Sequence, residues 1–127
     1  MSNLFSDAGA NAALDAVFTT SGTFLALFTA APTNSGGGTE VTTSGTAYAR
    51  QAISFAASAA RLKTSSATVT FPVATATYGT VTHWGIFSAS TAGTMYAWGA
   101  FTSSQTVNTG NQLTVPSGDI DLSFAST

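Results

Sequence analysis

Few side chains in this sequence could take part in chemistry, and His83 is the only histidine. As a general base, His83 would need a nucleophile and an orienting acid, yet no serine stands in a Gly-x-Ser-x-Gly motif. With one imidazole and no cysteine, a four-ligand zinc site in one chain would require three carboxylates. We therefore expect a strand histidine packed beside aromatic residues, in a protein that is not an enzyme and holds no metal or cofactor.

Asp119 and Asp121 stand two residues apart, and therefore on one face of a strand. Their oxygens could bind calcium together with backbone carbonyls of residues 116–118. They could equally form the solvated face of a surface strand, which is the interpretation we favour. A carboxylate pair that hydrolyses sugars would lie in a cleft lined by aromatic rings. The available rings are Tyr78, Trp84, Tyr96 and Trp98, but the scarcity of titratable groups disfavours hydrolysis.

Aromatic residues and one arginine are the remaining candidates for contacts. Phenylalanines are spread along the chain, about one in each predicted element, as expected of a single core. Trp84, Tyr96 and Trp98 could instead form a contact surface, because Trp and Tyr are enriched at interface hot spots. Arg50 could pair with Glu40, pair with a neighbouring subunit or lie at the surface, and the sequence leaves these alternatives open.

Charge is scarce, since only 6% of the 127 residues are charged and the formal net charge is −2. Small free-standing domains usually keep about a quarter to a third of their surface charged, so we expect much of this surface to be covered in an assembly. Three basic residues form no stripe for nucleic acid and no polybasic patch for a membrane. We also expect no signal peptide, lipid anchor or membrane span.

The N-terminal segment differs in pattern from the rest of the chain. An Ala-rich stretch predicts a short helix over residues 8–18, capped by Ser6 or Asp7 and ended by residues 19–22. The predicted apolar face of this helix comprises Leu14, Val17 and Phe18. We assign residues 1–22 to a helical arm and residues 23–127 to a β domain, within a single-domain chain.

From residue 23 onward the pattern is that of short strands, rich in Thr, Val, Ile and aromatic residues. Residues 24–29 form a nearly continuous apolar run, which predicts a strand covered on both faces. A loop with three glycines follows at residues 34–39. Further strands are predicted at residues 47–55, 68–71, 80–88, 94–101, 112–115 and 120–124. Short strands without intervening helices predict an all-β fold, an antiparallel sandwich or barrel.

Two of these strands have informative faces. In the last one, a buried face of Ile120, Leu122 and Phe124 is predicted to oppose a wet face of Asp119, Asp121 and Ser123. In residues 94–101, a Tyr96 and Trp98 face opposes a face made of Met95, Ala97, Gly99 and Phe101. Neither face is polar, so that strand is either central or part of an interface.

Several motifs occur in an order that resembles a family of small tailed-bacteriophage virion proteins, labelled either head decoration (cement) proteins or tail-fibre-like proteins. The motifs are Leu25-Ala-Leu-Phe-Thr-Ala-Ala-Pro-Thr33, Gly36-Gly-Gly-Thr-Glu-Val41, Tyr48-Ala-Arg-Gln-Ala-Ile-Ser-Phe55, Val69-Thr-Phe-Pro72 and Gly79-Thr-Val-Thr-His-Trp-Gly-Ile-Phe87. A strand with Tyr, Trp, Gly and Ala follows, and the resemblance covers most of the chain.

The resemblance implies an antiparallel β-sandwich of jelly-roll type that binds the outside of a capsid built from a major capsid protein of HK97-like fold. It implies self-association as a dimer or trimer, a place on the outer capsid surface of the virion after assembly in the host cytoplasm, and no catalytic residue. We expect capsid or subunit contacts from the N-terminal helix, the loop at residues 34–41 and the Tyr96 and Trp98 face. The candidate contact residues are Leu4, Phe5, Glu40, Tyr48, Arg50, Trp84, Tyr96 and Trp98.

Two other functions remain open at this point. One is a tail-fibre-associated or adhesin-like virion component that contacts the host surface. The other is a small carbohydrate-binding domain that uses Trp84 or Trp98 as a stacking platform.

Overall fold

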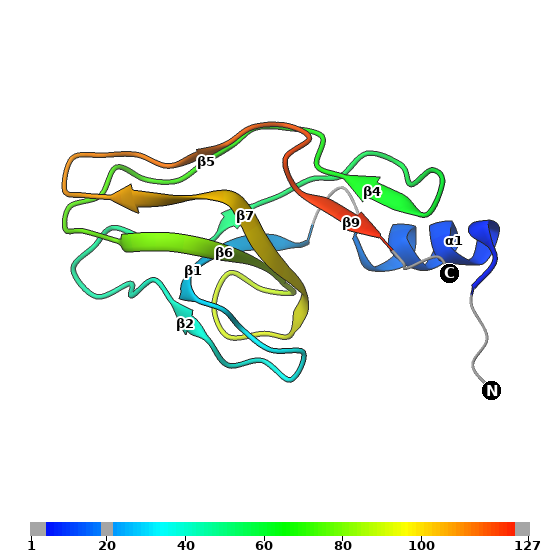
Figure 1. Cartoon of the computed structure of the whole chain (residues 1–127), viewed down its shortest axis with the longest axis horizontal. Coiled ribbons are helices and arrows are strands. Elements are labelled where there is room, and N and C mark those ends of the chain that lie inside the picture. Colours follow the sequence, from blue (N-terminus) through cyan, green and yellow to red (C-terminus); the bar gives the residue numbers. More distant parts are fainter. Residues whose placement is uncertain (1–4, 19–21, 124–127) are drawn as a thin grey trace.

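The structure is a computed structural model that describes residues 5–18 and 22–123. Helix α1 (Asp7–Val17) precedes a set of antiparallel strands (Figure 1). The main sheet has the order β2-β1-β6-β7, and β3 also pairs with β1. Its strands are β1 (Phe24–Ala30), β2 (Thr39–Glu40), β3 (Gln51–Ala52), β6 (Gly79–Phe87) and β7 (Met95–Val107). Two smaller ladders join β4 (Leu62–Thr64) to β9 (Asp121–Ser123) and β5 (Val69–Thr70) to β8 (Thr114–Val115).

Helix α1 forms for the reasons that its sequence indicates. Ser6 is the N-cap, and its hydroxyl accepts a hydrogen bond from the Gly9 N–H at 3.1 Å. Leu14 and Phe18 are buried in the core, as predicted. The prediction for Val17 is wrong, because its side chain is 41% exposed at the C-terminal end of the helix. The predicted end of the helix at residues 19–22 lies largely outside the described residues.

The core lies between the main sheet and the segments that carry the two small ladders. Leu25 and Leu27 of β1 and Ile86 of β6 contribute from the main sheet. Phe71, Val115, Ile120 and Leu122 contribute from the other side. Strand β1 is buried on both faces, as its apolar run predicts, because Phe28 on the outer face stacks on Phe87 at 6.1 Å.

These features confirm a mostly β protein with antiparallel sheets and one short helix, and the described strands do not close into a barrel. The predicted alternation at the C-terminal strand is confirmed for Ile120 and Leu122, which are buried, and for Asp119, Asp121 and Ser123, which are exposed. Phe124 lies outside the described residues. The more specific jelly-roll topology stays a prediction.

The strand predicted at residues 47–55 is wrong over most of its length, since only Gln51 and Ala52 pair with β1. Ala47 adopts a left-handed conformation with φ of +64°, which an extended strand does not allow. Strand β4 was not predicted at all. Strand β7 runs six residues beyond the predicted end at Phe101, through a polar stretch to Val107.

Candidate functional site

Arg50 and Glu40, two of the predicted contact residues, form a two-point ion pair inside the chain. The Arg50 Nε and Nη2 atoms each donate to a Glu40 carboxylate oxygen at 2.8 Å. The side chains are 9% and 26% exposed, so the pair is largely shielded from water. Hydrogen bonding to Glu40 raises the pKa of the Arg50 guanidinium, which stays charged.

The same guanidinium holds the connection between β6 and β7. Its Nη1 donates to the carbonyls of Ala89 and Ala92, at 3.0 and 2.7 Å, and its Cζ atom lies over the Phe87 ring, 3.8 Å from the ring centre. Arg50 therefore joins β2, β6 and the loop at residues 88–94 over the outer face of the sheet. Of the three alternatives left open by the sequence, the structure shows the pair with Glu40.

Tyr48, a third predicted contact residue, completes this network from inside the core. Its hydroxyl donates to Glu40 at 2.8 Å and accepts the Leu27 N–H of β1 at 3.0 Å. The Leu27 carbonyl accepts from the Val41 N–H at 2.9 Å. The Tyr48 phenol and the Val41 amide thus satisfy the Leu27 N–H and carbonyl, which a neighbouring strand would otherwise pair with. Burial, reinforced by the neighbouring carboxylate, raises the pKa of the Tyr48 phenol far above its ordinary value.

The other predicted contact residues make different individual contacts, although Trp84, Tyr96 and Trp98 all line one hollow. Trp84 is only 7% exposed and packs against Gly99 of β7, where a Cβ atom would lie 2.6 Å from its ring. Trp98 lies beside His83, with ring centres 6.2 Å apart, and its indole N–H donates to the Asn34 side chain at 3.0 Å.

Tyr96 is 48% exposed and contacts Phe18 edge-on. The register of β6 and β7 shifts at this position, so a simple alternation of faces with Trp98 does not hold. At the N-terminus, Phe5 is 52% exposed and its carbonyl accepts from Arg61 at 2.6 Å, whereas Leu4 lies outside the described residues.

All three cationic side chains are engaged in ion pairs with carboxylates of this chain. Besides Arg50 with Glu40, the pairs are Arg61 with Asp7 at 3.4 Å and Lys63 with Asp15 at 2.5 Å. The hydrogen bond from buried Lys63 lowers the pKa of Asp15 to about 2. Among the residues that the structure describes, Asp119 and Asp121 are the carboxylates that form no ion pair.

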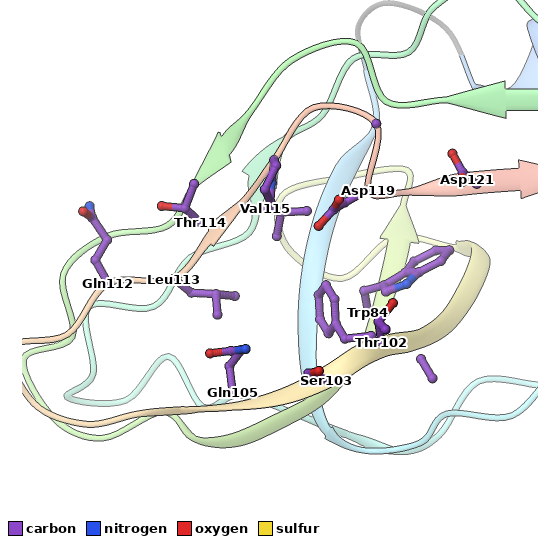
Figure 2. Close-up of a pocket in the computed structure, with 14 residues that line it drawn as sticks. Trp84, Thr102, Ser103, Gln105, Gln112, Leu113, Thr114, Val115, Asp119 and Asp121 are labelled. Atoms are coloured by element: carbon purple, nitrogen blue, oxygen red, sulfur yellow. The ribbon is translucent and has the colours of Figure 1, made fainter.

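Both unpaired aspartates line a hollow of about 690 Å³ beside β7 (Figure 2). We call it the β7 groove. It is bounded by Trp84 of β6, by β7 residues from Ala100 to Gln105 and by the segment from Gln112 to Asp121. It exists because β7 is the last strand of the main sheet and pairs on one side only in the described residues, with β8 and β9 opposite.

Figure 2 shows Gln105 rising from β7 while Leu113 and Asp119 point toward it from the opposite wall. A second hollow of about 460 Å³ shares Trp84 and Asp121 with the groove and continues it toward α1. That hollow is more apolar in its lining residues, which include Leu14, Phe18, Tyr96 and Leu122.

The sequence pointed to Trp84, Asp119 and Asp121 but not to their meeting in one groove. Gln105 carried no recognisable signal, since it lies in the polar extension of β7 that was not predicted as a strand. No group of three or more His, Asp or Glu residues that could hold a metal ion occurs in the described part of the chain. No described helix is long and apolar enough to cross a membrane.

Comparison with known proteins adds one finding. The family model described as Gp80, Podophage GP4 fiber I protein gp80, matches residues 1–123. No curated protein matches the chain. The matched residues include α1, the main sheet and the whole β7 groove.

Proposed function

Because the chain belongs to the Gp80 family, that of the podophage GP4 fiber I protein gp80, it is a structural component of a phage virion, and we propose that it is a subunit of a virion fibre. The family match over residues 1–123 carries this proposal. It supports the tail-fibre alternative more directly than capsid decoration, because the matching family is described as a fibre protein. Catalysis has no part in the proposed function.

The surface of the protein fits a subunit of an assembly. Strand β7 spans 13 residues without a single charge or proline, the features by which edge strands usually avoid pairing with other chains. All three cationic side chains form ion pairs within the chain. Such a surface suits contacts with other subunits, and self-association as a dimer or trimer is part of the proposal.

A capsid decoration role, with a major capsid protein of HK97-like fold as partner, remains the second candidate. The observation that favours it is the same charge-poor surface, which would suit a subunit fixed on a capsid lattice as well. The two functions differ in location and number, since decoration requires hundreds of copies on the capsid and a fibre requires few copies at the tail.

The test is the location and copy number of the protein in purified virions. Cryo-electron microscopy places the subunit, and quantitative gel densitometry against the major capsid protein counts it independently. Density for this fold in a fibre, at low copy number, supports the proposal. Hundreds of copies ordered on the outer capsid surface would overturn it in favour of decoration.

A further inference from the structure

Part of strand β7 lacks a partner strand on either side. The register with β6 jumps from Ala100 to Gln105, so residues 101–104 have no register partner in β6. On its other side β7 ends the main sheet, and no hydrogen bond joins the backbone of residues 101–106 to another segment there within the described chain. Residues 102–106 are also exposed. This stretch therefore presents backbone donors and acceptors with which an added strand can pair.

The sequence of the same stretch is symmetric in character about Ser104. Outward from Ser104 in both directions come a polar residue, a threonine and an apolar residue, in the order Phe101-Thr-Ser-Ser-Gln-Thr-Val107. Antiparallel pairing of two such strands about a two-fold axis at Ser104 matches like with like. Thr102 then faces Thr106 of a second copy, and Ser103 faces Gln105. Hydroxyl and amide side chains in such cross-strand positions can hydrogen-bond to one another.

The main sheet already contains a contact of this kind. The hydroxyl groups of Thr80 in β6 and Thr106 in β7 lie 2.9 Å apart and share a hydrogen bond across the two strands. Figure 2 shows Thr102, Ser103 and Gln105 along the part of β7 that borders the groove. A strand whose pattern is the same in both directions fits a second copy of itself better than a strand of unrelated sequence.

The charge distribution does not prevent two copies from meeting at this edge. Pairing about a two-fold axis brings identical side chains together, so a charge near the axis would face its own copy. Strand β7 contains no charged residue, and the whole chain has a formal net charge of only −2. Asp119 and Asp121 lie on the opposite wall of the groove, so repulsion between two copies is confined to these exposed carboxylates, where salt screens it.

From these observations we propose that two copies of this chain pair antiparallel through residues 101–107 of β7, about a two-fold axis at Ser104. The pairing joins the two main sheets into one continuous sheet. The same edge serves both copies, so the contact is complete with two chains and favours a dimer over a trimer. This inference rests on the proposed function, of which self-association is a part, and adds the surface through which it occurs.

The first test is sedimentation velocity of the full-length chain at concentrations from about 1 to 300 µM. A short strand edge is a small interface, so we expect a monomer–dimer equilibrium with a Kd of about 1–100 µM. Ser104→Lys should weaken association about tenfold or more, because two ammonium groups would meet at the axis. Ser44→Lys is the matched control and should leave the Kd unchanged. Ser44 is an exposed serine that follows β2, at the opposite end of the main sheet.

The second test uses cysteine cross-linking, which is specific here because the chain has no cysteine. With oxidised glutathione, Ser104→Cys should form a disulfide-linked dimer, since the axis places this residue beside its own copy. Ser103→Cys and Gln105→Cys should link readily when the two variants are mixed, and much less when each is alone. Ser44→Cys is the control for random collision and should remain largely monomeric. All four positions are at least partly accessible on the surface, so these variants should fold normally.

Two results would overturn the inference. One is a chain that stays monomeric over the whole concentration range, and the other is Ser104→Cys that links no faster than Ser44→Cys. The proposed function is tested separately, by location and copy number in the virion. A monomeric chain in fibres refutes only the β7 pairing, whereas dimers found on the capsid refute the fibre and leave the pairing in place.

Discussion

Replacing Arg50 with methionine should destabilise the fold strongly, because it keeps an unbranched apolar stem but removes the guanidinium. The substitution removes two hydrogen bonds to Glu40 and two to the carbonyls of Ala89 and Ala92. Breaking a buried ion pair by removing one partner costs about 3–5 kcal/mol, because the other charge is left without its partner. Glu40 is 26% exposed and regains some water, so we expect the lower end, about 3 kcal/mol.

Equilibrium unfolding in urea measures this loss. With a dependence on urea of about 1.5 kcal/mol per molar, a loss of 3 kcal/mol lowers the midpoint by about 2 M. Arg50→Lys keeps the charge but cannot reach Glu40 and both loop carbonyls together, so it should lose about 1–2 kcal/mol. A double-mutant cycle with Glu40→Gln isolates the pair, with an expected coupling of about 1–3 kcal/mol.

The measurement can also refute the argument. If Arg50→Met lowers the free energy of unfolding by less than about 1 kcal/mol, the guanidinium does not hold these segments together. Zero coupling in the cycle would show that the ion pair contributes nothing beyond its separate side chains. Amide exchange at residues 88–94 provides a local check, because this loop should exchange faster in the variant than in the unmodified chain.

Three further predictions concern other contacts that stabilise the fold. Tyr48→Phe leaves the buried Leu27 N–H without an acceptor and should cost about 1–3 kcal/mol in urea unfolding; an unchanged midpoint would contradict this. Gly99→Ala places a methyl 2.6 Å from the Trp84 ring and should cost about 1–3 kcal/mol, with a changed tryptophan fluorescence spectrum. Because the pKa of Asp15 falls from 3.8 to about 2 on folding, its stabilising effect is complete above about pH 4 and is lost as the pH falls toward 2. Thermal unfolding at pH 5, 3 and 2 should therefore show a smaller loss for Asp15→Asn than for the unmodified chain.

The elements that local patterning specifies could be predicted from the sequence. Helix α1 has a capping serine and buried residues at helical spacing, and the β1 run is apolar on both faces. Strand β6 matched its prediction within one residue at each end. In each case the signal lies within a few neighbouring residues, which is the information that periodicity and capping rules use.

The segment from residue 47 to 55 shows where this approach fails. It contains the strand formers Tyr48, Ile53 and Phe55, but these are buried through side-chain packing while most of the backbone stays outside any ladder. What holds the segment is the hydrogen bond of Tyr48 to β1 and the ion pair of Arg50 with Glu40. The Leu27 partner of Tyr48 is distant in sequence, and Glu40 was only one of several possible partners for Arg50. Tertiary contacts therefore decided the conformation of this segment.

The groove could not be predicted for a related reason. Asp119, Gln105 and Trp84 come from three parts of the chain, and only the pairing order of the strands brings them together. The wet face of the last strand was predicted, but not what it faces. The polar residues 102–106 lack the apolar alternation by which strands are recognised. The strand that forms one side of the groove could therefore not be predicted there.

The distribution of charge links the fold to the assembly. Lys63 and Arg61 tie α1 to the β4 region, and Arg50 ties the β6–β7 loop to the sheet, so the ion pairs stand where strand ladders are short or absent. Because these charges are used in internal ion pairs, little net charge remains on the surface to repel other molecules. The uncharged β7 edge is then open to pairing with other chains, which is a hazard for a free subunit. In the proposed fibre, neighbouring subunits would cover that edge and remove the hazard.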